Sequence, residues 1–448
     1  MQSNCKTTPR MCHMKIHIKH CHVIDPANGV DRPADVFVAD GRIAGIGAAP
    51  DGFSADRVID ASGLVAVPGL VDLCARLREP GYEYKATLES EMKAAVHGGV
   101  TSLVCPPDTD PALDEPGLVE MLKFRAERLK QGHVFPQGAL TLGLKGEVLT
   151  EMAELTDSGC IGFGQADVPI TNTQVLLRAM QYANTFGYTV WLRPQDAWLG
   201  KGGVAHSGAV AARLGLAGVG VSAETIALHT IFELMRITGC RVHLCRISSA
   251  NGVELLRAAR AEGLPVTADV SLNHVHLTDV DIGFFDPMYR LEPPLRSGRD
   301  RAALRQALLD GTIDAICSDH CPVDDDEKLL PFDQASAGAI GLELLLPLAL
   351  KWARESGLGD AAAIRLVTQR PAGIVGGPAL AQGAGTLSVG ALADICVYDP
   401  QAWWKVEPAA IASQGKNTPW LRKELQGEVA YTLVAGEVAY ERAAVATA

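Results

Sequence analysis

The sequence lacks the features that mark membrane, nucleic-acid-binding and secreted proteins. No apolar run reaches about 18 residues, the length of a membrane-spanning helix, so none is expected. Positive charge is not in excess either. The formal net charge is −12 at pH 7, which argues against binding to nucleic acid or to an anionic membrane. With 448 residues, 48% of them hydrophobic, and no internal repeat or low-complexity tract, the composition is that of a soluble globular protein.

A disulfide framework is missing as well. The chain has 11 cysteines, an odd number, and they are scattered rather than clustered. Several lie inside apolar stretches, as Cys105, Cys317 and Cys396 do, where a buried free thiol is the better interpretation. Free thiols are typical of a reducing compartment, so we expect a cytoplasmic protein.

The N-terminal segment differs in composition from the rest of the chain. Residues 1–13 are polar and lack the apolar core of a secretion signal, so we expect a disordered leader, with Met11 or Met14 as a possible natural start. A soft-metal site is one interpretation of a nearby cluster: Cys12, His13, His17, His20, Cys21 and His22. The alternation of Ile16 and Ile18 with polar neighbours favours a half-buried strand instead.

Strand signals dominate both ends of the chain. Residues 14–67 hold short apolar runs broken by turn residues, among them Asp40-Gly41, which predicts a hairpin. Apolar strands return in residues 384–442. We expect these two segments to form one composite β-sandwich.

The middle of the chain, residues 68–375, alternates short apolar strands with longer helical stretches. The expected strands are 102–105, 189–192, 241–245, 265–268 and 315–317, and the expected helices are 118–129, 172–185, 223–238 and 251–262. Such alternation predicts a parallel sheet, and its length suits a closed barrel. The expected fold is therefore α/β: a TIM-like (β/α)8 barrel with a composite β-sandwich from the N- and C-terminal segments.

Eight short motifs occur in order along nearly the whole chain. They are PGLVD at 68–72, REPG at 78–81, GGVT at 98–101, GVEL at 252–255, PPLR at 293–296, SDH at 318–320, GLE at 341–343 and KNTP at 416–419. Through these motifs the span 14–442 resembles a bacterial dihydroorotase of the amidohydrolase superfamily. The resemblance implies a hydrolase of cyclic amide C–N bonds. It also implies zinc ions at the carboxyl ends of barrel strands, where they activate water and polarise the ring amide.

The positions that hold metal ligands in this family carry other residues here. On the first barrel strand the family has His-x-His-x-Arg, two imidazoles on one face that reach one cation. The altered ligand positions are Cys74 and Arg76 on that strand, Gln165 or Ala166 in place of the bridging acidic residue, and Arg193 and Arg246 in place of two further histidines. Only Asp319 is kept, which the resemblance makes a metal ligand and general base.

Positions that bind substrate in the family are altered too. Arg78, which matches the arginine that holds the substrate carboxylate, is retained. Asp108 replaces an asparagine nearby and is expected to repel that carboxylate. Glu292 replaces a second asparagine, and Val323 replaces a histidine. The resemblance therefore points to a site that has lost its metal and most of its substrate contacts, with Arg78 retained.

Three arginines at ligand positions have a clear physical consequence. A guanidinium group is always cationic and has no lone pair to donate, so it excludes zinc both by lost ligation and by like charge. Asp319 without a metal would be a costly unpaired buried charge. We therefore expect Asp319 to pair with at least one of Arg76, Arg193 and Arg246. A new anion site, for phosphate or a carboxylate metabolite, is the alternative interpretation of the same arginines.

Three further patterns each have two interpretations. A thiolate zinc site is one interpretation of Cys74, Cys105, Cys245 and Cys321; small apolar filler is the favoured one, with Cys245 pointing to the opposite side of its strand from Arg246. The acidic run 324–327 resembles a cation site but is expected to be a solvated loop. Trp403 and Trp404 belong either to the core or to an exposed contact patch.

The resemblance to degenerate family members leads to a functional hypothesis. We expect a non-catalytic dihydroorotase-like protein without a cofactor. Its expected partner is the catalytic chain of aspartate transcarbamoylase in pyrimidine biosynthesis, with contacts between copies of this chain in addition. Two alternatives stay open: an active cyclic amidohydrolase with an unconventional metal site at Asp319, and a module that binds an anionic metabolite through Arg78 and the three new arginines.

Overall fold

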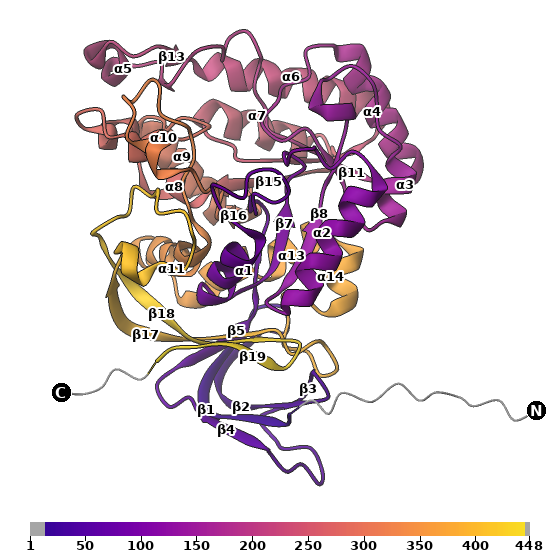
Figure 1. Cartoon of the computed structure of the whole chain (residues 1–448), viewed down its shortest axis with the longest axis vertical. Coiled ribbons are helices and arrows are strands. Elements are labelled where there is room, and N and C mark those ends of the chain that lie inside the picture. The colour runs from indigo at the N-terminus through magenta and orange to yellow at the C-terminus, as the bar shows by residue number, and fades with distance from the viewer. Residues whose placement is uncertain (1–13, 444–448) are drawn as a thin grey trace, which may run out of the picture.

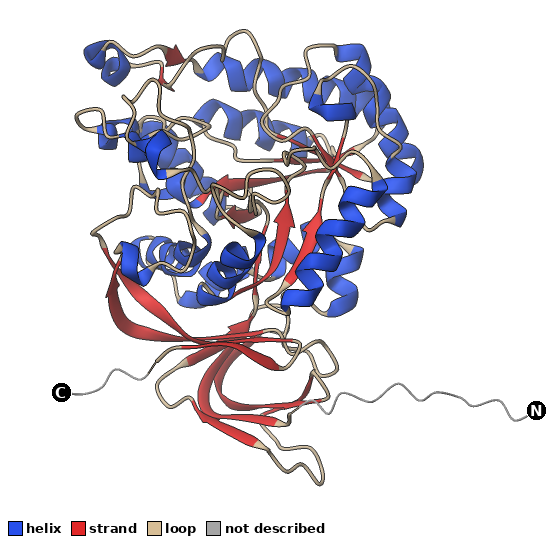
Figure 2. Ribbon diagram, viewed as in Figure 1, coloured by secondary structure: helices blue, strands red, loops and turns tan. Residues whose placement is uncertain are grey.

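The computed structural model describes residues 14–443, so the predicted leader, residues 1–13, lies outside the described residues. The chain forms a TIM-like (β/α)8 barrel with a flanking composite β-sandwich (Figure 1), which confirms the expected fold class. Figure 2 shows helices gathered around the barrel strands, and the sandwich as an almost helix-free layer at one end of the molecule. No helix within the described range is long and apolar enough to cross a bilayer.

The barrel strands are parallel and follow chain order. They are β6 (Leu70–Asp72), β7 (Val100–Cys105), β8 (His133–Pro136) continued by β9 (Gly138–Ala139), β10 (Phe163–Gly164), β11 (Thr189–Leu192), β14 (Arg241–Leu244), β15 (Val266–Ser271) and β16 (Ala315–Cys317). A bridge between Ala75 and His320 closes the ring. Because all strands run in the same direction, their carboxyl ends meet at one mouth.

Helices cover the outside of the barrel, and further short elements lie in its loops. The helices are α1 (Leu88–His97), α2 (Pro116–Leu129), α3 (Met152–Asp157), α4 (Thr173–Phe186), α5 (Ala209–Leu214), α6 (Val221–Thr238), α7 (Ala250–Ala261), α8 (Leu272–His276), α9 (Gly298–Leu309), α10 (Asp325–Lys328), α11 (Leu345–Glu355), α12 (Asp360–Val367), α13 (Gln369–Val375) and α14 (Gly377–Gln382). The 3-10 turns are η1 (Leu142–Leu144), η2 (Asp279–Ile282), η3 (Pro287–Tyr289), η4 (Leu342–Leu344) and η5 (Pro408–Ala410), and a short parallel pair joins β12 (Ala205–His206) to β13 (Gly218–Val219).

The helix boundaries follow local capping chemistry. Asn172 and Ser249 accept backbone N–H groups at the starts of α4 and α7, and such caps satisfy amides that a helix leaves free. Gly187 and Gly239 end α4 and α6 in the left-handed conformation, which glycine adopts without strain. The helices expected from the sequence therefore agree with the structure to within about two residues at each end.

Strands from both ends of the chain form one eight-stranded sheet. It contains β1 (Ile16–Asp25), β2 (Val30–Ala39), β3 (Arg42–Ile46), β4 (Arg57–Asp60), β5 (Val65–Pro68), β17 (Ile395–Lys405), β18 (Glu424–Val434) and β19 (Glu437–Glu441). The join is made where β5 pairs with β1 on one side and with β17 on the other. Asp40 and Gly41 both have positive φ, 51° and 74°, and turn β2 into β3, so the predicted hairpin is confirmed.

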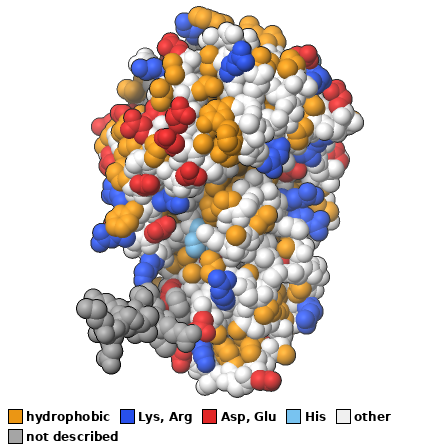
Figure 3. Space-filling view, turned by 90° about the vertical axis from the view of Figure 1, so that its right-hand side faces the viewer, with side chains coloured by type: hydrophobic (Ala, Val, Ile, Leu, Met, Phe, Trp, Pro, Cys, Tyr) orange, Lys and Arg blue, Asp and Glu red, His pale blue; other side chains and the backbone are white. Residues whose placement is uncertain are grey.

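The sandwich and the barrel are in close contact. Helices α1 and α11 pack against β18, and Gly99, at the start of β7, lies against Cys396 of β17. A side chain at Gly99 would collide with that thiol, which gives the GGVT motif a packing role. Figure 3 shows one face of the molecule, where charged side chains of both signs are scattered among hydrophobic ones and acidic side chains gather toward the upper left.

The histidine-rich N-terminal stretch is a strand, as the favoured interpretation predicted. His17 and His22 of β1 pair with Asp35 and Asp31 at 2.7 and 2.6 Å, while Cys21 is buried. Cys12 and His13, the other members of the proposed metal cluster, lie outside the described residues. The nine cysteines within the described part of the chain are all free thiols, and all but Cys245 are buried.

Candidate functional site

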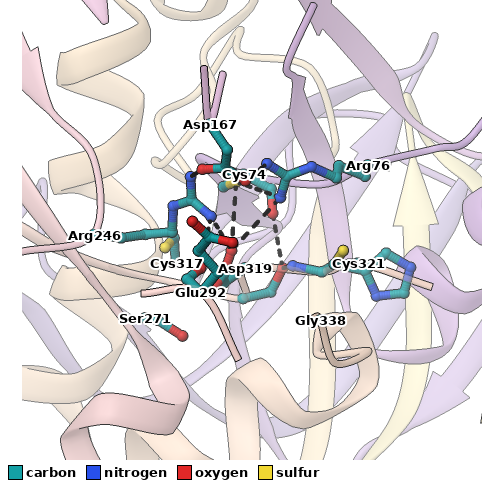
Figure 4. A network of polar contacts seen from close by, with 12 residues as sticks. Cys74, Arg76, Asp167, Arg246, Ser271, Glu292, Cys317, Asp319, Cys321 and Gly338 are labelled. Carbon is teal, nitrogen blue, oxygen red and sulfur yellow. Dashed lines mark hydrogen bonds and ion pairs between the residues drawn. The ribbon is translucent and has the colours of Figure 1, made fainter. Parts of the chain in front are cut away.

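Three buried arginines converge at the mouth of the barrel. Arg76 follows β6, Arg193 follows β11 and Arg246 follows β14, so each stands just beyond the carboxyl end of its strand. Arg246 has a positive φ of 57°, which departs from regular strand geometry at the point where the chain leaves the barrel. Figure 4 shows Arg76 and Arg246 on either side of a group of carboxylates.

Asp167 is the centre of the cluster. Its carboxylate lies 2.5 Å from Nη2 of Arg76 and 2.6 Å from Nε of Arg193, and it also accepts a hydrogen bond from Nη2 of Arg246. Burial alone would raise the pKa of Asp167, but Arg246, Arg76 and Arg193 outweigh it and hold the pKa well below its usual range. Asp167 therefore stays ionised and joins three strand ends.

Asp319 pairs with two of the arginines, as expected. Its Oδ1 lies 2.9 Å from Nη1 of Arg246 and 3.7 Å from Nη1 of Arg76, while Arg193 does not contact it. Burial raises the pKa of Asp319 above its usual value, although Arg246 and Arg76 act in the opposite direction. The prediction that Asp319 finds an arginine partner is confirmed.

Two outer carboxylates complete the cluster. Asp108 accepts a hydrogen bond from Nε of Arg76 at 2.6 Å, and Glu292 accepts one from Nη2 of Arg193 at 2.9 Å. Three guanidinium groups thus face four carboxylates: Asp108, Asp167, Glu292 and Asp319. The positive charge of these three arginines is therefore matched by carboxylates of the protein itself.

The other predicted site residues lie around this cluster. The amide nitrogen of Gln165 donates to Oγ1 of Thr141 at 2.9 Å and to the carbonyl of Leu144, so its side chain is engaged outside the arginine cluster. Val323 is buried, and its backbone N–H donates to Asn417. Arg78 donates to the carbonyl of Pro322 and to Sγ of Cys321, both at 2.9 Å. Part of its hydrogen-bonding capacity is therefore used inside the protein.

The four candidate thiols do not form a metal site together. Among the described residues one group has the spacing of metal ligands, and it consists of His243, Cys245 and Asp269. His243 is already bonded to Asp269 at 2.9 Å and to Thr267, and Asp269 also accepts the backbone N–H of Arg246. Burial raises the pKa of the Cys245 thiol well above its usual value. His243 and Asp269 thus belong to a hydrogen-bond network that a metal ion would have to break.

The expected direction of Cys245 is wrong. Cys245 packs with a cluster of buried side chains that includes Trp191 and Cys317, while Arg246 reaches Asp319 at the mouth. The two side chains therefore do not lie on opposite sides of a strand. The reason is that Arg246 has a positive φ and lies beyond the end of β14, so the strict alternation of a β-strand no longer applies.

The residues at the family's ligand positions do not fit a zinc ion. Cys74 is a buried thiol whose pKa burial raises well above its usual value, and Gln165 is bonded elsewhere. The three arginines offer no lone pair and place positive charge where a cation would bind. Asp319, which has the chemistry of a ligand, is held by two of these guanidinium groups.

The acidic run 324–327 and the Trp403–Trp404 pair are the remaining candidates. Asp324 caps α10, and Glu327 pairs with Lys85 at 2.8 Å, so the acidic run 324–327 forms a short helix rather than the expected loop. Trp403 is exposed on β17, while its neighbour Trp404 donates to the carbonyl of Gly427. Trp403 thus lies at the surface, while Trp404 is bonded within the β17–β18 ribbon.

A parallel (β/α)8 barrel with a flanking β-sandwich, and with its polar residues at the strand ends, defines the amidohydrolase class. The family model described as dihydro-orotase-like matches residues 63–252, and that of the amidohydrolase family matches residues 204–440. A dihydroorotase-like protein from Pseudomonas putida is 46% identical over 427 residues, which cover 95% of this chain and 99% of that protein. The chain belongs to the dihydroorotase-like family of amidohydrolases.

Other relatives agree with this assignment. A dihydroorotase-like protein from Pseudomonas aeruginosa is 43% identical over 96% of this chain and 100% of its own length, and a dihydroorotase from a Geobacter species is 39% identical over the same shares. Among solved structures, L-hydantoinase (dihydropyrimidinase) from Arthrobacter aurescens aligns with a TM-score of 0.85 at 25% identity, covering 96% of this chain and 97% of that one.

Proposed function

We propose that this chain is a non-catalytic member of its family and acts as a structural subunit that supports aspartate transcarbamoylase in the cytoplasm. The observation that carries the proposal is the arginine cluster at the mouth of the barrel. Arg76, Arg193 and Arg246 stand where the family resemblance places metal ligands, and each is bound to a carboxylate of the protein. A centre of this composition has no evident way to activate water.

The intact frame supports a role that depends on shape. The barrel, the sandwich and the KNTP motif at 416–419 are all held by internal contacts; the amide nitrogen of Asn417, for example, donates to the carbonyls of Cys321 and Gly338. The choice of transcarbamoylase as partner rests on the resemblance to degenerate family members that assemble with it. Two relatives carry the name dihydroorotase-like protein rather than dihydroorotase, which is in keeping with this proposal.

Neither alternative function is favoured by the contacts. An active hydrolase centred on Asp319 would need that carboxylate free for a metal, yet two guanidinium groups hold it. An anion-binding module would need unpaired cations, yet the three arginines are outnumbered by their own carboxylates, among them Asp108 and Glu292. The hydrolase would therefore require the cluster to open, and an anion would be left with Arg78, which donates to Pro322 and Cys321 rather than to a carboxylate.

Co-expression with the transcarbamoylase catalytic chain of the same organism tests the proposal. Size-exclusion chromatography with light scattering should give one complex that contains both chains, with a total buried interface above roughly 1,200 Å² in its structure. Transcarbamoylase expressed alone, and with an unrelated barrel protein of similar size, provides the control. Two well-folded chains that elute separately at micromolar concentration, with transcarbamoylase assembly and activity unchanged, would contradict it.

A further inference from the structure

Three segments at the mouth end of the barrel are fastened to one another. They are the loop 80–86 after β6, the segment 279–290 that contains η2 and η3, and the segment 323–334 that contains α10. Lys85 of the first pairs with Glu327 of the third at 2.8 Å. The buried Lys328 donates to the carbonyl of Pro287 at 3.0 Å, which joins the third to the second. We call the outer surface of these three segments the mouth-cover face.

The mouth-cover face exposes large apolar side chains. Phe284 is 90% exposed and Leu329 is 82% exposed, the two highest values among the large hydrophobic residues described. Three more belong to the same segments: Tyr84, Val280 and Leu330. Several exposed apolar side chains on adjoining segments are unusual for a surface that meets only water, and they mark interaction sites.

Negative charge surrounds these apolar side chains. The segments 279–290 and 323–334 contain eight carboxylates and only two basic residues, of which Lys328 is buried. Five of the aspartates are exposed and form no ion pair within the described part of the chain: Asp281, Asp286, Asp325, Asp326 and Asp333. A face of this composition is complementary to a surface in which basic residues surround apolar ones.

A moving lid is a weaker interpretation of these segments. A lid opens to admit substrate, but the mouth beneath is filled by the paired Arg76, Arg193 and Arg246. The contacts of Lys85 and Lys328 also hold the segments in one arrangement. The exposed apolar side chains thus lie on segments that are joined to one another, as suits a docking site.

We propose that the mouth-cover face docks a basic, apolar surface of the partner protein. The inference rests on the proposed function, in which that partner is the transcarbamoylase catalytic chain. A second copy of this chain is a poorer occupant. A twofold contact would bring the exposed aspartates of both copies together, and the whole chain already carries a net charge of −12.

Paired variants test the apolar and the charged parts of the face separately. F284S/L329S removes the two most exposed apolar side chains, and D325K/D326K reverses the charge at α10. Matched controls lie on the barrel wall: F124S/L380S changes two exposed apolar residues of α2 and α14, and E120K/E127K makes the same charge change on α2. Thermal melting of the isolated chains should be alike for all four, because the substitutions are at the surface.

The readout is affinity for purified transcarbamoylase catalytic chain at low and high salt. Both mouth-cover variants should bind roughly tenfold or more weakly than wild type, and D325K/D326K should also lose most of the salt dependence, while the controls bind normally. If wild type binds and the mouth-cover variants bind equally well, the face is not the interface, although the proposed function stands. If wild type does not bind, both proposals fail. If the variants instead abolish self-association, a second copy is the occupant and the proposal is wrong.

Discussion

At the scale of single residues, Asp167 determines how the mouth of the barrel is held together. One carboxylate contacts three guanidinium groups, from Arg76, Arg193 and Arg246, and these come from three different strand ends. In a metal-dependent relative a cation would join ligands from separate strands in the same way. Here the roles of charge are reversed, because an anion joins cations.

The sequence predicts part of this cluster and misses its centre. The pairing of Asp319 with an arginine follows from charge replacement alone, because a buried carboxylate needs a partner. Asp167 is not predicted, because the family resemblance places Gln165 or Ala166 at the acidic position. The available signal was a carboxylate two residues beyond Gln165, close to the end of an apolar stretch that leads into the mouth.

Removing the charge of Asp167 should cost more stability than removing that of Asp108. D167N would leave three guanidinium groups without their shared partner, and we expect a loss of about 2–3 kcal/mol, reduced from the value for a fully buried pair because the side chain is 31% exposed. D108N removes a contact with Arg76 alone and should cost about 1 kcal/mol. Urea unfolding of both variants measures the difference; an equal or smaller loss for D167N would show that Asp167 is not central.

Restoring a histidine at one ligand position should lower the stability of the protein without restoring activity. R246H leaves Asp319 with Arg76 at 3.7 Å as its remaining cationic partner, so we expect a loss of about 3–5 kcal/mol and no dihydroorotase activity. R246K keeps the charge but cannot reach Asp167 and Asp319 together as the guanidinium fork does, and it should lose about 1–2 kcal/mol. Calorimetry measures the stability of the two variants, and an assay with added zinc measures their dihydroorotase activity. An R246H protein that is as stable as wild type, or that turns over dihydroorotate, would contradict the account.

At the scale of elements, long periodic segments are predictable and very short ones are not. Helices α2, α4, α6 and α7 are predictable to within about two residues, because each has an apolar period and an end signal: a proline at the start of α2, and a cap or glycine at an end of α4, α6 and α7. Strand β10 spans two residues, Phe163–Gly164, which is too short to show any period. Such strands gain their place from their neighbours in the barrel rather than from their own sequence.

The last residue of helix α8, His276, joins this short element to its neighbours. Nε2 of His276 donates to the carbonyl of Leu348 in α11 at 2.9 Å, and its ring meets Trp420 edge-on. Burial lowers the pKa of His276 to about 4, although the hydrogen bond to Leu348 raises it. The imidazole is therefore neutral in the folded protein at neutral pH.

His276 should contribute to the loss of folding stability at acidic pH. Its folded pKa lies below the unfolded value of about 6.5, so its contribution to stability is present above pH 6.5 and is lost as the pH falls toward 4. H276Q retains a donor for Leu348 and does not titrate, so it should lose less stability over this range than wild type, by up to about 3 kcal/mol. H229Q, a matched change of an exposed histidine in α6, should behave like wild type. Denaturation curves at pH 7, 5.5 and 4 measure the effect, and parallel curves for H276Q and wild type would refute it.

At the scale of the whole molecule, the barrel and sandwich are predictable because their signals are spread over many residues. Strand–helix alternation indicates the barrel, and β-rich ends indicate the sheet that β5 completes between β1 and β17. The mouth-cover face is not predictable, since the exposure of Phe284 and Leu329 depends on contacts between segments far apart in sequence. The acidic run 324–327 is the part of that face visible in the sequence.

For the whole molecule, we infer that a filled ion-pair cluster stands in place of a catalytic metal centre. Protein purified from zinc-supplemented cells, and again after incubation with zinc, should contain far less than one zinc per chain by elemental analysis. It should neither form nor hydrolyse dihydroorotate, while a catalytically active dihydroorotase prepared in parallel does both. About one zinc per chain, with turnover that a chelator abolishes and zinc restores, would contradict the account.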